Sequence, residues 1–224
     1  MSERWWVAVS AEPILVRSPL AEEILETTEE ERPFEAILDV ESTGLQPDLY
    51  RLVSIGVLIL PMGQEGARPQ VKAFFVDEPT DECEREAIER AMPILHDATT
   101  VYTWRGEQFD VPFLLARALK HGIHMPWLPE KHIDLSEVVR AFLVSSHPQA
   151  KVPDLDRMCE FLFGYKRKLR LRGFDIPELY EAWQEGDEKA REQILEHLRE
   201  DLEMTYMVLK AIKPYVDAYL GMAR

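Results

Sequence analysis

The chain of 224 residues carries 41 acidic and 26 basic side chains, which gives a formal net charge of −15. Its hydrophobic content of 46% suffices for one globular domain with a full core, and no stretch reaches the roughly 18 uninterrupted apolar residues of a membrane span. Cys83 and Cys159 are too few for a disulfide framework, and the first ten residues lack the pattern of a secretion signal. We therefore expect a soluble, cytoplasmic protein.

The order of the expected elements indicates an α/β fold. In chain order, these elements are strand 5–9, helix 19–31, strands 34–40, 52–60 and 71–76, helix 81–92, strand 99–104, helix 111–119, a short strand near residue 132, and helices 155–165 and 187–215. Three strands in a meander, followed by alternating strands and helices, predict a mixed central sheet flanked by helices. We divide the chain into an N-terminal extension (1–33), a main domain (34–217) and a C-terminal tail (218–224).

Segment 37–45, with the sequence ILDVESTGL, places two carboxylates two residues apart on an apolar strand. Side chains at positions i and i+2 project from the same face, so Asp39 and Glu41 are expected side by side at the edge of a buried sheet. Because unpaired buried anions repel each other, the pair favours a bound cation such as Mg²⁺ or Mn²⁺. The alternative is a solvated strand end that binds no ion.

Two further acidic segments follow. Asp110 comes after the strand expected at 99–104 and opens a helical pattern, so on its own it is best explained as a helix N-cap. His197 and Asp201 share one face of the last helix, where a pair at this spacing is usually a surface hydrogen bond. No basic side chain is assigned to pair with any of these acids.

Together the three segments resemble the motifs of the DEDD superfamily of 3′–5′ exonucleases, whose fold is RNase H-like. The likeness is closest to the bacterial ribonuclease H-like exonucleases of the YprB type and covers residues 34–210. Further features of that type are FGY at 163–165, DIPELY at 175–180, and the pair His132 and Asp134. We interpret this pair as a strand-end contact or as a contact behind the metal ligands.

The resemblance implies an RNase H-like fold and a phosphodiester hydrolase that uses two divalent ions, Mg²⁺ or Mn²⁺. His197 would be the general base. The metal-binding acids would be Asp39, Glu41, Asp110 and Asp201.

The segment after the first two acids would grip the terminal nucleotide in this resemblance. Thr43 and Gly44 would present backbone groups, and Leu45 would place an apolar side chain beside the base. For Leu45, a place in the core at the end of the strand is an equally good prediction.

Three positions depart from the family pattern. Ser42 stands where Thr is usual, and only three residues separate His197 from the last acid, a spacing typical of the tyrosine type of the superfamily. Arg105 stands where Asn is usual. Because an arginine cannot accept a hydrogen bond, we expect Arg105 to contact a substrate phosphate instead.

Residues 165–173, with the sequence YKRKLRLRG, form a compact basic run without an acid. One interpretation is a phosphate track that includes Lys166, Arg167 and Lys168. The other is a solvated loop whose charges balance neighbouring acids.

The predicted function is thus a 3′–5′ exonuclease acting on single-stranded ends of DNA or RNA, with nucleic acid as its partner. Three alternatives remain open: a structure-selective endonuclease of the RNase H or resolvase kind, an inactive nucleic-acid-binding module on the same fold, and a small-molecule metallohydrolase.

Overall fold

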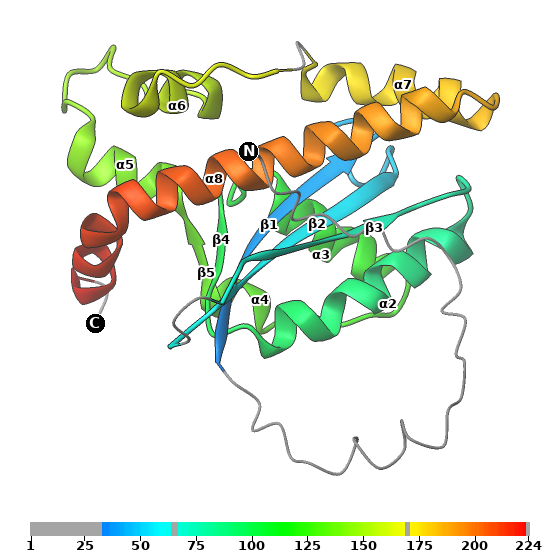
Figure 1. The fold of residues 1–224 in the computed structure, drawn as a ribbon. Helices are drawn as coiled ribbons and strands as arrows, with labels where there is room; N and C mark the ends of the chain where they lie inside the picture. Colours follow the sequence, from blue (N-terminus) through cyan, green and yellow to red (C-terminus); the bar gives the residue numbers. More distant parts are fainter. Residues whose placement is uncertain (1–32, 64–66, 169–170, 223–224) are drawn as a thin grey trace.

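A five-stranded sheet forms the centre of the protein in a computed structural model, which describes residues 33–63, 67–168 and 171–222 (Figure 1). The strand order is β3-β2-β1-β4-β5. This arrangement confirms the α/β class and the mixed sheet expected from the sequence. The strand at 5–9 and the helix at 19–31 lie outside the described residues, as does most of the proposed N-terminal extension.

The first three strands form the antiparallel meander expected from the sequence. They are β1 (Phe34–Ser42), β2 (Leu52–Pro61) and β3 (Gln70–Phe75). The last two, β4 (Val101–Thr103) and β5 (His132–Asp134), run parallel to β1. The carboxyl end of β1 therefore lies at the same edge of the sheet as the carboxyl ends of β4 and β5.

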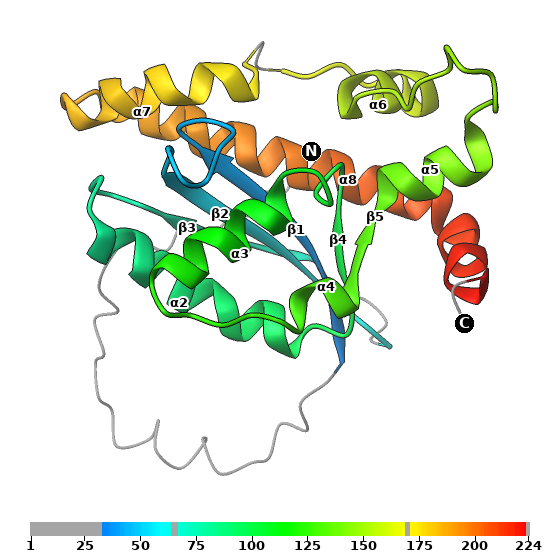
Figure 2. The same cartoon turned by 180° about the vertical axis from the view of Figure 1, so that it is seen from behind.

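Helices cover both faces of the sheet (Figures 1 and 2). On one face lie α2 (Asp81–Asp97), α3 (Asp110–Lys120) and the short α4 (Leu128–Lys131). On the other lie α5 (Leu135–Leu143) and the long α8 (Glu188–Met222), against which α6 (Leu155–Phe163) and α7 (Ile176–Gln184) pack. A 3₁₀ turn (Gly173–Asp175) precedes α7. Among the described residues, no helix combines the length and apolar character that crossing a bilayer requires.

The alternation of side chains along β1 decides which way its acids point. Leu38 and Val40 pack into the core beneath α2 and α3, whereas Ile37 packs into the core beneath α8. Because side chains alternate between faces along a strand, Asp39 and Glu41 share the face of Ile37. Both carboxylates therefore project toward α8.

Three helix ends differ from the sequence expectation. The helix expected at 81–92 continues through Pro93 to Asp97. The helix expected at 155–165 ends at Phe163, because Gly164 adopts a left-handed conformation with φ of 65° and closes the helix. The last helix continues beyond its expected end near residue 215 to Met222. Val216 and Tyr219 still pack into the core there, so apolar contacts extend the helix past Pro214.

A buried ion pair connects the loop after β1 to α2 and α3. The Glu84 carboxylate of α2 accepts hydrogen bonds from Arg117, from His121 and from the backbone N–H of Leu52. Burial alone would raise the pKa of Glu84, but these donors hold it below its ordinary value. Arg117 also donates to the carbonyl of Pro47 at 2.8 Å, so the 43–51 loop has a fixed anchor.

Close packing of α8 on β2 depends on Gly56, which pairs with Asp39 in the β1–β2 register. A Cβ at Gly56 would lie 2.8 Å from a methyl carbon of Leu198 and 2.9 Å from one of Leu202. We expect Gly56→Ala to lower the free energy of unfolding by about 1–3 kcal/mol, the usual cost of an overpacked core. Chemical denaturation measures this loss.

Gly221→Ala is the matched control, because a Cβ at this helical glycine meets no atom within 4 Å. We expect this variant to be as stable as the native protein or slightly more stable. Equal stability of the two variants would show that α8 has room to move.

Candidate active site

Side chains from three elements line an open cavity of about 330 Å³ at the carboxyl edge of the sheet. β1 contributes Asp39 and Glu41, the first residue of α3 is Asp110, and α8 contributes His197 and Asp201. The structure therefore brings together all five residues that the sequence predicted as catalytic.

The closest group of possible metal ligands joins β1 to α8. One ligand atom each from Glu41, His197 and Asp201 lie within 4.8 Å of one another. Nε2 of His197 is 3.5 Å from Oε1 of Glu41 and 3.4 Å from Oδ2 of Asp201. The imidazole thus lies between the two carboxylates and is nearly buried.

Burial and mutual repulsion shape the electrostatics of the acids. Burial, followed by the charges of neighbouring acids, raises the pKa of Asp39 and of Glu41 well above their ordinary values. Burial also raises the pKa of Asp201, although His197 and Arg167 oppose the shift. Without a bound cation, the cluster therefore favours protonated carboxyl groups.

Asp110 is not the N-cap of α3, although the sequence pattern predicts this role. Phe109 occupies the N-cap position, and the Asp110 carboxylate instead accepts a hydrogen bond of 2.8 Å from the backbone N–H of Val40. Burial raises the pKa of Asp110 to about 7, assisted by the charges of Asp134 and Asp201. The contact to Val40 fixes the start of α3 beside the acids of β1.

The expectation that no basic side chain pairs with the acids is wrong, because Arg167 pairs with one of them. Its guanidinium pairs with Asp201 and with Asp156 and donates a hydrogen bond of 3.1 Å to Nδ1 of His197. Burial opposes the charge of Arg167, but the two carboxylates raise its pKa above the ordinary value. This arginine is therefore inside the cavity, whereas the sequence alone placed it in a basic run without distinguishing it from its neighbours.

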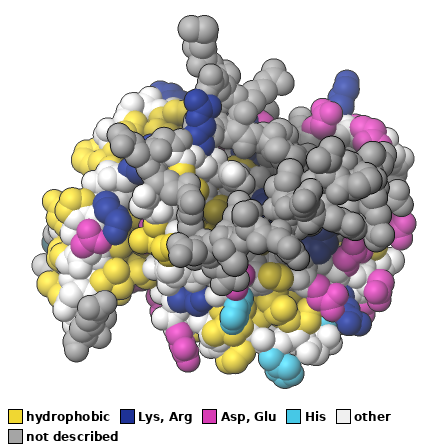
Figure 3. Space-filling model, turned by 60° about the horizontal axis from the view of Figure 1, so that its bottom comes forward, with side chains coloured by type: hydrophobic (Ala, Val, Ile, Leu, Met, Phe, Trp, Pro, Cys, Tyr) yellow, Lys and Arg dark blue, Asp and Glu magenta, His cyan; other side chains and the backbone are white. Residues whose placement is uncertain are grey.

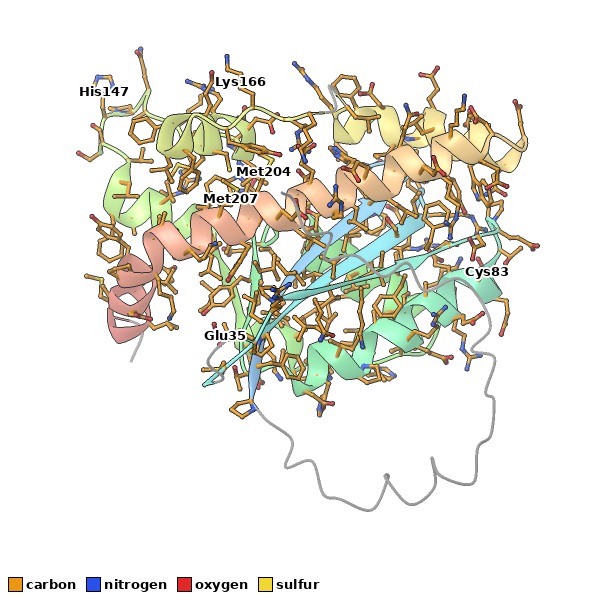
Figure 4. The ribbon with its side chains drawn as sticks, in the orientation of Figure 1. Glu35, Cys83, His147, Lys166, Met204 and Met207 are labelled. Atoms are coloured by element: carbon orange, nitrogen blue, oxygen red, sulfur yellow. The ribbon has the colours of Figure 1, made fainter. Side chains whose placement is uncertain are left out.

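The two lysines beside Arg167 take other positions. Lys166 forms an exposed ion pair with Glu160 at 3.1 Å and points away from the sheet (Figure 4). Lys168 is exposed, and its backbone N–H donates to Glu200. Residues 169–170 lie outside the described part of the chain, so a continuous phosphate track stays a prediction.

Segment 43–45 forms the start of the loop after β1. Thr43 Oγ1 accepts a hydrogen bond from the backbone of Arg51 at 2.9 Å. A Cβ at Gly44 would lie 2.5 Å from the ring of Tyr50, so glycine permits this close approach. Leu45 is 79% exposed, and the alternative prediction of a core leucine is wrong.

Arg105 and Asp134 organise the loop between β4 and α3. Arg105 has a φ of 62°, and its guanidinium donates to the carbonyl of Val152 at 2.7 Å. Asp134 accepts from the backbone N–H groups of Arg105 and Glu107 and also caps α5. His132 contacts Thr103 at 2.7 Å. Burial lowers the pKa of the His132 imidazole and the charge of Asp134 opposes this shift, so the two residues of β5 interact electrostatically.

Several residues of the site were missed in the sequence. Asp156 lies in the first turn of α6, and Glu200 is buried on α8, where it accepts a hydrogen bond of 2.6 Å from Tyr165. Trp104 and Asp154 also line the cavity without having been predicted, whereas Leu171 and Arg172 belong to the basic run at 165–173. Glu200 could have been found from the sequence, because it directly precedes Asp201, an acid of a recognised motif.

Comparisons with known proteins agree with this fold. A sequence profile described as the RNase_H superfamily matches residues 36–213. A relative from Methanocaldococcus jannaschii, described as an uncharacterized protein, is 30% identical over 182 residues, which cover 79% of this chain and 94% of the relative.

Archaeal DNA polymerases share part of their length with this chain. DNA polymerase 1 of Pyrococcus abyssi is 28% identical over 153 residues, which are 58% of this chain and 18% of the polymerase. The family B DNA polymerase of Pyrobaculum calidifontis has a similar structure, with a TM-score of 0.62 and 18% identity over 81% of this chain and 25% of the polymerase. The chain thus spans about a quarter or less of these polymerases. The profile match over most of the sequence shows that the chain belongs to the RNase_H superfamily.

Proposed function

We propose that the protein is a metal-dependent 3′–5′ exonuclease that hydrolyses phosphodiester bonds at single-stranded ends of DNA or RNA. The observation that carries the proposal is the convergence of four carboxylates and one imidazole on one open cavity. The carboxylates of Glu41 and Asp110 are buried, and those of Asp39 and Asp201 are partly buried. Membership of the RNase_H superfamily supports a nuclease. The order of the three acidic segments, which resembles that of DEDD exonucleases, supports the direction of attack.

The donor set fits hard divalent cations. Carboxylate oxygens with one imidazole nitrogen suit Mn²⁺ and Mg²⁺, and a divalent ion would replace the protons that the buried acids favour. Two such ions, held by Asp39, Glu41, Asp110 and Asp201, would supply positive charge at the scissile phosphate and at the attacking water.

His197 is suited to remove a proton from that water. Burial lowers the pKa of its imidazole, so the ring is neutral at neutral pH and able to accept a proton. Glu41 and Asp201 lie beside the ring and would stabilise the imidazolium that forms.

The surface charge favours recognition of a strand end over the binding of a long duplex. On the face shown in Figure 3, which lies away from the carboxyl edge of the sheet, Lys and Arg side chains of the described residues stand among Asp and Glu side chains and do not gather in one patch. With a net charge of −15, extended contact with phosphates would be opposed by repulsion. The exposed Leu45, on the loop that leaves β1 beside the acids, offers an apolar contact for a terminal base.

Degradation of end-labelled strands in Mg²⁺, Mn²⁺ or EDTA tests the proposal. We expect the native protein to shorten the strand from its 3′ end only with metal, and Asp39→Asn to abolish hydrolysis. Because Asp39 is repelled by its neighbours, the metal-free variant should melt at the same temperature or higher. Asp97→Asn, at an exposed acid at the end of α2, is the control that should retain activity.

A circular single strand separates the alternatives. An exonuclease leaves the circle intact, whereas internal cuts would contradict the proposal and favour the endonuclease. Binding of strands without any turnover would favour an inactive module.

The raised pKa of Asp110, about 7, predicts how metal-free stability depends on pH. The folded state binds this proton at higher pH than the unfolded state, whose aspartates titrate near pH 4, so stability is lost as pH rises from about 4 to about 7. We expect Asp110→Asn to flatten this decline, as measured by melting temperature in EDTA. A decline of the same size in both proteins would rule out Asp110 as its source.

The role of His197 is tested by His197→Ala. We expect the rate to fall by roughly 10²–10⁴, the usual contribution of a positioned base. The acid limb of the native pH–rate profile, which reflects protonation of the base, should be altered in the variant. Near-native rates with reduced stability would instead identify a structural histidine.

A further inference from the structure

Arg167 occupies one side of the proposed metal site. Its side chain is 11% exposed and lies between Asp201 on α8, which is 16% exposed, and Asp156 on α6, which is 52% exposed. Two other arginines line the cavity, but Arg105 donates to a backbone carbonyl and Arg172 lies over the ring of Phe174. Arg167 is thus the cavity arginine that pairs directly with an acid of the cluster.

The contact between Arg167 and His197 fixes the position of the imidazole proton. A guanidinium group can only donate, so Nδ1 of His197 must accept the hydrogen bond from Nη1 of Arg167. In a neutral imidazole the proton then resides on Nε2, which faces Glu41 and Asp201. In this arrangement neither ring nitrogen has a lone pair free for a water molecule or a metal ion.

A divalent cation and Arg167 would compete for the same groups. A cation held by Glu41 and Asp201 needs the Asp201 carboxylate, with which Arg167 already pairs. The role of His197 as a base needs an unprotonated ring nitrogen that is free, and Arg167 occupies the unprotonated one. A divalent cation and the Arg167 guanidinium, both in contact with Asp201, would also repel each other strongly in a buried site.

We propose that Arg167 is a resident counter-ion that a divalent cation displaces, an inference that rests on the proposed metal site. It neutralises Asp201 and occupies Nδ1 of His197 until metal binds, and its release leaves that nitrogen free. The displaced guanidinium can remain paired with Asp156, whose Oδ1 already accepts a hydrogen bond of 2.9 Å from Nε of Arg167. Arg167 is therefore a positioning residue that couples metal binding to the state of the imidazole.

Titration of the metal-free protein with Mn²⁺, followed by calorimetry, tests this competition without measuring hydrolysis. Arg167→Met removes the charge and keeps most of the side-chain length. We expect it to bind Mn²⁺ more tightly, by a factor in the range of about 5–150 that is typical of coupling between two ligands. Lys166→Met is the matched control, because it removes the same charge from the neighbouring residue, which pairs with Glu160 at the surface.

Nitrogen-15 NMR of the histidine rings gives a second readout that needs no metal. We expect the His197 signals of the native protein to show the tautomer protonated at Nε2, and the Nδ1 signal to shift in Arg167→Met. The spectrum of His197→Gln identifies which signals belong to this ring.

The outcomes separate this inference from the proposed function. Equal or weaker Mn²⁺ binding by Arg167→Met, or equal tightening by Lys166→Met, overturns the inference and leaves the exonuclease proposal standing. A His197 tautomer protonated at Nδ1 in the native protein also overturns it. Failure of every variant to bind Mn²⁺ overturns the inference together with the proposed metal site.

Discussion

Repulsion among buried carboxylates is the constraint on which the rest of the structure depends. Burial raises the pKa of Asp39, Glu41, Asp110 and Asp201, and the charges of neighbouring acids raise it further in all four. Such a cluster is stable only if the elements that carry it are held by contacts elsewhere. The sheet, α3 and α8 supply those contacts through two apolar cores, one on each face of β1.

Within the part of the chain that the structure describes, two buried charge clusters have opposite character. Around Glu84, the acid is matched by Arg117 and by further donors, so its charge is stabilised in place. Around Asp39, acids outnumber the one paired arginine, so the cluster stays reactive toward protons and cations. The first cluster anchors the loop after β1 and thereby supports the position of the second.

The sequence predicted much of the fold because the informative patterns were local. Alternating apolar residues located the meander, and the periods of α3 and α8 located two helices that carry site residues. The motif spacing pointed to five side chains, and the structure places all five around one cavity. The position of Arg167 could not be predicted, since it depends on how the connection after Gly164 packs against α8, which no local period encodes. The exposure of Leu45 was similarly undetermined, because an apolar side chain at the end of a strand fits either a core or a surface loop.

The absence of a side chain at Gly56 has a consequence for the reaction as well as for packing. His197 and Asp201 reach Glu41 only because α8 rests directly on β2, with Leu198 and Leu202 filling the space above the glycine. The distance between the two halves of the site is therefore a property of the helix–sheet spacing. A wider spacing between α8 and the sheet would therefore move His197 and Asp201 away from Glu41. The geometry of the site therefore depends on how closely α8 packs on the sheet.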